Sequence, residues 1–191
     1  MIFVIFFPAS WNTWGEGKFQ SDVPLVLGKL RYGDWCEWPR DEQASIRNYL
    51  RSVWCFVLAQ PVNPSQYSPS RADEWLCAIA NAESEIAPYL RAWLETEDPV
   101  YDANLFQLID WNANGLLNGS VPPGYWDGAH AQWVQLVTRL TSAPLQKRLV
   151  RATQNLDEID LAVKAEEIAL LLSKVPVPIP RIGGPSAVLN L

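Results

Sequence analysis

His130 is the chain's only histidine, and Cys36, Cys55 and Cys77 are its only cysteines. An imidazole can act as a general base and a thiolate as a nucleophile, but a catalytic base needs an orienting group and a reacting neighbour. The sequence around His130 offers neither, although catalytic partners meet in space rather than in sequence order. No Gly-x-Ser-x-Gly motif and no Cys-x-x-Cys pair is present. One histidine and three dispersed cysteines do not suit zinc, so we expect no catalytic centre and no metal, which favours a protein that is not an enzyme.

A short glycine-rich segment, Gly15 to Phe19, has a lysine where a phosphate-binding loop has one. The residue five positions before Gly17 is Asn12 rather than glycine, and Phe19 stands where a hydroxyl side chain would hold magnesium. The carboxylate of Glu16 would also repel phosphate. We therefore expect no nucleotide and no other cofactor.

The first forty residues contain an unusual group of aromatic and charged side chains. Its members are Trp11, Trp14, Arg31, Asp34, Trp35, Glu37 and Trp38. Tryptophan and arginine are enriched in the hot spots of protein interfaces, and no helical spacing accounts for these four tryptophans as core residues. We therefore predict that the group forms a partner-binding surface. The alternative is that the tryptophans fill one end of the fold and donate their indole N–H groups to loop carbonyls.

The charge balance narrows the class of partner. Fifteen Lys and Arg against 21 Asp and Glu give a net charge of −6, and no concentrated basic run is visible, which excludes a typical nucleic-acid binder. The acidity suits a basic protein target. Our leading interpretation is a protein that binds another protein, as an adaptor or as a small inhibitor or immunity-type protein. The alternative is a small-molecule-binding protein or enzyme with a tryptophan-lined pocket served by Asp34, Glu37 or His130.

The elements that position these residues are predicted to be helices. From Pro39 onward apolar residues recur at helical spacing between capping residues and prolines. The predicted helices cover roughly residues 39–59, 70–84, 86–94, 98–112 and 126–140, a short one from 142, and 157–173. We predict an all-α fold of six to eight helices packed as successive antiparallel hairpins, with an irregular aromatic N-terminal segment. The expected core tryptophans are Trp54, Trp75, Trp93, Trp126 and Trp133, and His130 is expected to be buried beside the last two.

The last predicted helix, 157–173, is apolar on two sides. Leu161, Ala165, Ile168 and Leu172 lie on one side, and Ile159, Val163 and Leu170 lie on the other, with Glu166 near the second. Such a helix either is sandwiched within the fold or buries one side in a partner, which includes a second copy of this chain. We expect the sandwich. The Glu-x-x-His pattern of carboxylate-bridged metal bundles is absent here.

Domain organisation and compartment follow from the remaining features. Residues 1–174 are predicted to form one domain, and 175–191 a proline-rich extended tail.

The odd number of unpaired cysteines favours a reducing compartment, so we expect a cytoplasmic protein. The apolar run from Ile2 to Phe7 is short for a signal peptide and too short to span a membrane. The alternative is that the true start lies upstream and that this run ends a longer element.

Overall fold

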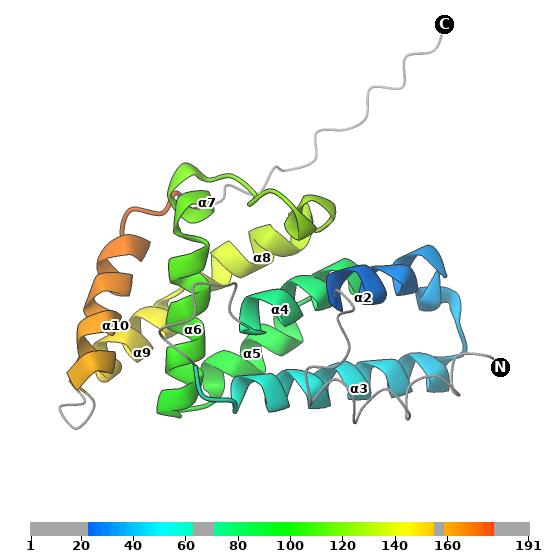
Figure 1. The fold of residues 1–191 in the computed structure, drawn as a ribbon, viewed down its shortest axis with the longest axis horizontal. Coiled ribbons are helices and arrows are strands. Elements are labelled where there is room, and N and C mark those ends of the chain that lie inside the picture. The colour runs from blue at the N-terminus through cyan, green and yellow to red at the C-terminus, as the bar shows by residue number, and fades with distance from the viewer. Residues whose placement is uncertain (1–22, 63–70, 155–158, 178–191) are drawn as a thin grey trace, which may run out of the picture.

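The computed structural model describes residues 23–62, 71–154 and 159–177, and these ranges contain helices and no strand (Figure 1). The helices are α2 (Val23–Tyr32), α3 (Arg40–Leu58), α4 (Arg71–Ala82), α5 (Ala87–Glu95), α6 (Pro99–Trp111), α7 (Ala113–Asn118), α8 (His130–Leu140), α9 (Ala143–Thr153) and α10 (Ile159–Leu172). Two short 3-10 helices, η2 (Trp35–Glu37) and η3 (Tyr125–Gly128), connect them. The predicted all-α fold is confirmed for this part of the chain.

The helix boundaries follow the local signals from Pro39 onward. The clearest case is α6, where the Asp98 carboxylate accepts a hydrogen bond from Val100 N at 2.8 Å and Pro99 occupies the first helical position. The carboxylate provides a partner for one of the N–H groups that every helix start leaves unpaired. Proline has no N–H group, so at this position it loses no hydrogen bond that the helix could form. The predicted fifth helix begins differently, because residues 125–128 form the separate turn η3 before α8 starts at His130.

The segment predicted to be irregular contains a helix, α2, and this is a correction. Pro24 and Gly28 lie inside it and make the sequence look unlike a helix. Pro24 is tolerated because it lies in the first turn, and Gly28 costs about 1 kcal/mol relative to alanine. Val23, Leu27 and Leu30 are buried at spacings of four and three residues. Burial of this stripe against α4 compensates for the weak intrinsic propensity.

A second unpredicted helix, α7, contains Gly115, which the sequence suggested as the end of α6. A Cβ atom at position 115 would lie 3.0 Å from Ser120 O and from Pro122 Cγ, so any other residue would require these neighbours to shift. Gly119 then ends α7 with a φ of 62°, the left-handed conformation that glycine adopts without strain. The glycines that look like a helix end therefore belong to a tight extra turn.

The five predicted core tryptophans are all buried. Trp54 and Trp93 meet edge to face with their ring centroids 5.2 Å apart, and Trp126 and Trp133 pair at the same separation. The Trp54 indole donates to Tyr89 O at 3.0 Å, which links α3 to α5. Edge-to-face pairs contribute about 0.5–1.5 kcal/mol beyond the burial of their area, and the bonded N–H removes the cost of a buried polar group.

The helices form two groups at opposite ends of the molecule, with α6 between them (Figure 1). At one end α9 and α10 lie side by side, and α10 also packs on α6 and α7. At the other end α2 lies along α4, and α3 packs against α4 and α5. Successive pairs such as α3 with α4 and α9 with α10 match the expected hairpins, whereas the main contact of α2 is α4 rather than its neighbour in sequence.

Two further features of the described residues concern the chain's end and membranes. Val175 is buried and Pro176 lies against Gly119, so the start of the predicted tail packs on the domain. The rest of the tail, from residue 178, is outside the described residues.

Among the helices described, none combines the length and apolar character needed to cross a bilayer.

Candidate functional site

Trp35, the central tryptophan of the predicted binding surface, lies in the core. Only 1% of its surface is exposed, and its indole N–H donates to Ala82 O at 2.8 Å. The guanidinium of Arg47 covers the ring, with Cζ 4.8 Å from the ring centroid. These contacts match the alternative interpretation, in which the tryptophan fills one end of the fold. Trp11 and Trp14 lie outside the described residues.

The other members of the predicted surface are placed around η2. Trp38 is half-buried and its indole donates to Gly33 O at 2.9 Å, whereas Arg31, Asp34 and Glu37 are exposed. Arg31 donates to Gly128 O at 2.9 Å and so joins α2 to η3. The charged side chains of the predicted surface are therefore exposed at this end of the molecule, whereas Trp35 is buried and Trp38 is half-buried. The partner-binding role of the set as a whole remains a prediction.

Of the residues proposed to serve an enzymatic pocket, Asp34 and Glu37 lie at η2 and His130 lies on α8. His130 is exposed at the first position of α8, so the prediction that it is buried is wrong. The helix begins four residues later than the tryptophan spacing suggested, so His130 lies at its exposed start rather than one turn inside it. No cluster of three or more metal-ligating side chains occurs among the described residues.

A buried polar network that the sequence did not reveal lies beneath η2 and α3. Glu83 is almost fully buried, and its carboxylate lies 3.3 Å from Arg47 Nε and accepts a hydrogen bond from the Tyr89 hydroxyl at 3.1 Å. Burial and the negative charge of Glu83 both raise the pKa of Tyr89 above its ordinary value. Gln132 of α8 donates to Glu83 O at 2.7 Å. The network joins α3, α5 and α8.

A second buried carboxylate, Asp73, lies where α4 meets α6 and η3. Its Oδ1 accepts hydrogen bonds from Asn112 Nδ2 at 2.7 Å and from Trp126 Nε1 at 3.4 Å. Burial raises its pKa from 3.8 to about 6, and these two hydrogen bonds offset only part of that rise. A perturbed pKa can mark a functional group, but the two hydrogen-bond donors described here, Asn112 and Trp126, are buried side chains of the core.

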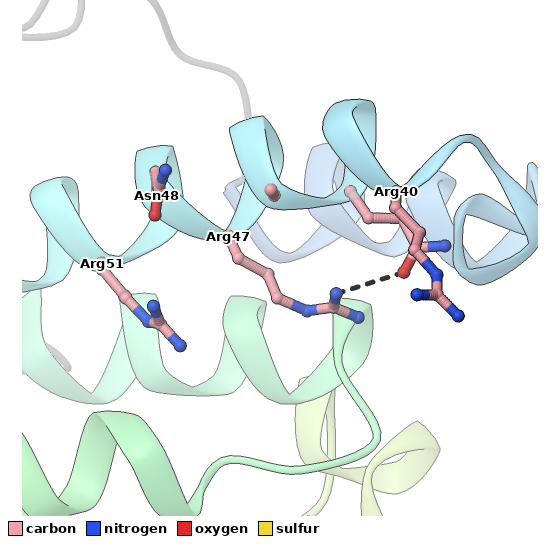
Figure 2. Close-up of a pocket in the computed structure, with 6 residues that line it drawn as sticks. Arg40, Arg47, Asn48 and Arg51 are labelled. Atoms are coloured by element: carbon pink, nitrogen blue, oxygen red, sulfur yellow. Dashed lines mark hydrogen bonds between the residues drawn. The ribbon is translucent and has the colours of Figure 1, made fainter.

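Two surfaces remain as candidates for binding. The first is a depression of about 360 Å³ on α3, lined by Arg40, Gln43, Ala44, Arg47, Asn48 and Arg51 (Figure 2). We call it the arginine groove, and no tryptophan lines it. The second is the outer face of α10, which consists of Ile159, Val163, Glu166 and Leu170. We call it the α10 stripe.

The α10 stripe contradicts the expected sandwich within the described structure. The inner residues Ala165, Ile168 and Leu172 are buried, while Ile159 and Leu170 are 68% and 61% exposed. Val163 is 54% exposed. Figure 1 shows why, because α9 and α6 cover only one side of this terminal helix. The sequence did contain the signal, since these residues form the second apolar side of the helix.

Charges surround the α10 stripe unevenly. Lys164 lies 3.1 Å from Asp110 Oδ2 and 3.2 Å from Glu167 Oε2, so its positive charge is neutralised within the fold. Glu166 lies within the stripe and forms no ion pair or hydrogen bond with any residue that the structure describes. Asp160 is exposed nearby on the same helix. The outer face of α10 is therefore mainly apolar, with the Glu166 carboxylate within the stripe and Asp160 beside it.

Comparison of the chain with protein-family models, with curated proteins and with solved structures finds no match.

Proposed function

We propose that this protein acts by binding another protein, and that the α10 stripe is the docking surface for a basic amphipathic helix of that partner. The observation that carries the proposal is the line of three exposed apolar side chains, Ile159, Val163 and Leu170, on a helix whose other side is already packed. The line extends over about 16 Å at 1.5 Å per residue, which is about three turns of a helix. A partner helix laid along it would bury apolar side chains at matching spacing.

Charge favours a basic partner over a second copy of this chain. In a symmetric pair each α10 stripe would face itself, so the unpaired Glu166 carboxylates and their acidic neighbours would approach one another. Like charges at an interface are unfavourable, whereas a lysine or arginine of a partner would pair with Glu166. The net charge of −6 would also speed the encounter with a basic protein. These features suit an adaptor or a small inhibitor of a basic target.

The small-molecule alternative has less support. It needs a pocket lined by tryptophans, but the five tryptophans of the core are buried, and two pairs of them pack edge to face. No tryptophan lines the arginine groove. We therefore favour protein binding.

The test uses a fluorescent helical peptide made of lysine and leucine, with leucines spaced to match the stripe, and measures its affinity by anisotropy. Leu170→Ser should weaken binding by about tenfold, since it removes one buried apolar anchor. Leu25→Ser is the matched control, because Leu25 is also 61% exposed but lies on α2. Glu166→Lys should weaken binding further and reduce its dependence on salt.

Three outcomes would contradict the proposal. The peptide could fail to bind the unaltered protein, or Leu170→Ser and Leu25→Ser could bind it equally. Sedimentation could also show a dimer that Leu170→Ser converts to a monomer. In that last case the α10 stripe joins two copies of this chain, and the basic partner is wrong.

A further inference from the structure

The arginine groove carries a second inference, independent of the α10 stripe. Arg40, Ala44, Arg47 and Arg51 recur at spacings of four, three and four residues, which places them in one line along α3. Figure 2 shows the side chains of Arg47 and Arg51 leaving the helix on the same side, with Asn48 between them in sequence pointing elsewhere. The small side chain of Ala44 leaves room at the centre of this line, and the volume of about 360 Å³ lies there.

Arg47 is held in place from three directions. Its Nε lies 3.3 Å from the buried Glu83 carboxylate, one terminal nitrogen donates to Gln43 Oε1 at 3.1 Å, and its guanidinium covers the Trp35 ring. A guanidinium that is already fixed loses little conformational entropy when it binds a ligand. Glu83 offsets part of its charge, so Arg47 orients the groove and adds less positive charge to it than Arg40 or Arg51 does.

Arg40 and Arg51 supply the net positive charge. Both are exposed, and neither forms an ion pair or hydrogen bond with a residue that the structure describes. Arg40 is the first residue of α3, where the helix dipole is positive and disfavours a cation. Arg51 follows Arg47 by four residues, a spacing at which like charges repel. An anion in the groove would relieve both repulsions.

We propose that the arginine groove binds a small ligand with two or more linked phosphate groups. Guanidinium groups match phosphate oxygens in a bidentate fork, which an ammonium group cannot do. The line from Arg40 to Arg51 extends over about 16 Å of helix, which is longer than a single phosphate can bridge. The groove is at the small end of ligand pockets, which favours a compact polyphosphate over a nucleic-acid backbone.

The flanking residues are compatible with this ligand. Gln43 and Asn48 lie on either side of the line, and the Gln43 amide donates to Cys36 O and Trp38 O and accepts from Arg47, so it helps to fix Arg47. The buried Glu83 carboxylate, which lies 3.3 Å from Arg47 Nε, is already paired with Arg47 and the Tyr89 hydroxyl, and it does not line the groove. The acidic residues of the first turn, Asp41 and Glu42, lie about 100° and 200° around the helix from Arg40.

The experiment titrates inorganic tripolyphosphate into the full chain and measures the dissociation constant by calorimetry and the melting temperature by fluorescence. Sodium sulfate and sodium chloride at the same ionic strength are the reference ligands. Tripolyphosphate should raise the melting temperature and sulfate should do so less. Arg51→Gln and Arg40→Gln should each weaken binding by about tenfold, and Arg51→Lys by less, because it keeps the charge and loses the fork. Arg91→Gln is the control, an exposed arginine of α5 that does not line the groove.

A readout without ligand separates binding from folding. In phosphate-free buffer Arg51→Gln should melt no lower than the unaltered protein, because Arg51 forms no ion pair or hydrogen bond with the residues that the structure describes and its repulsion of Arg47 disappears. The inference is overturned if tripolyphosphate acts no more strongly than sulfate, or if Arg91→Gln loses as much affinity as Arg51→Gln. It is also overturned if a short oligonucleotide or an acidic peptide displaces tripolyphosphate and binds more tightly, because the ligand class would then be different.

Discussion

Replacing Asp73 by asparagine should remove one component of the pH dependence of folding stability. Burial raises the pKa of this carboxyl from 3.8 to about 6, because the core favours its neutral form. Its Oδ1 accepts hydrogen bonds from Asn112 and Trp126. An asparagine keeps an oxygen in this position as acceptor and cannot titrate, so Asp73→Asn isolates the effect of the proton.

The sign follows from where the proton is bound. Between about pH 4 and about pH 6 the folded protein keeps a proton on Asp73 that the unfolded chain releases, so this group makes stability fall as pH rises. At about 1.4 kcal/mol per pKa unit, the difference between the two pKa values corresponds to about 3 kcal/mol. Asp73→Asn should therefore gain about 3 kcal/mol relative to the unaltered protein between pH 4 and pH 7.

The assay is urea unfolding followed by tryptophan fluorescence at intervals from pH 4 to pH 7. Ile79→Val serves as the control, because Ile79 is fully buried in the same helix and does not titrate. Its cost of about 0.5–1.5 kcal/mol should be the same at every pH. If the curve for Asp73→Asn runs parallel to that of the unaltered protein, the folded state does not hold the proton as argued here and the reasoning fails.

Three further predictions follow from the core and from the residues that could bind metal. Trp35→Ala should lower the free energy of unfolding by about 3–5 kcal/mol in urea, and a loss below about 1 kcal/mol would restore the partner-binding interpretation of this residue. Arg148 is buried and bonds to the Asp102 carboxylate and to Trp93 O, so Arg148→Ala should cost about 3–5 kcal/mol by leaving Asp102 uncompensated. The double variant with Asp102→Asn should recover part of that loss in the same assay, and no recovery would argue against the pairing. EDTA should leave the melting temperature unchanged, and a drop in calorimetry would reveal a metal site.

The features that the sequence determined are those set by interactions over about four residues. Capping and proline placement predicted the start of α6 at Asp98, and the spacing of apolar residues predicted α3 and the burial of Trp54 and Trp93. Hydrogen bonds within a helix and side-chain contacts along one face act at this range, so their pattern can be recognised in the sequence.

The tertiary structure decided the contacts between residues far apart in the chain. Trp35 belongs to no helical stripe, and it becomes a core residue because its indole reaches Ala82 O, 47 positions away. Arg47 becomes a fixed group through Glu83, which lies in the connection between α4 and α5. In α10 the spacing of residues showed two apolar sides, but only the placement of α6 and α9 determined which side is covered. The spacing of apolar residues shows which face of a helix is apolar. Whether that face is buried depends on which neighbouring helix the fold places against it.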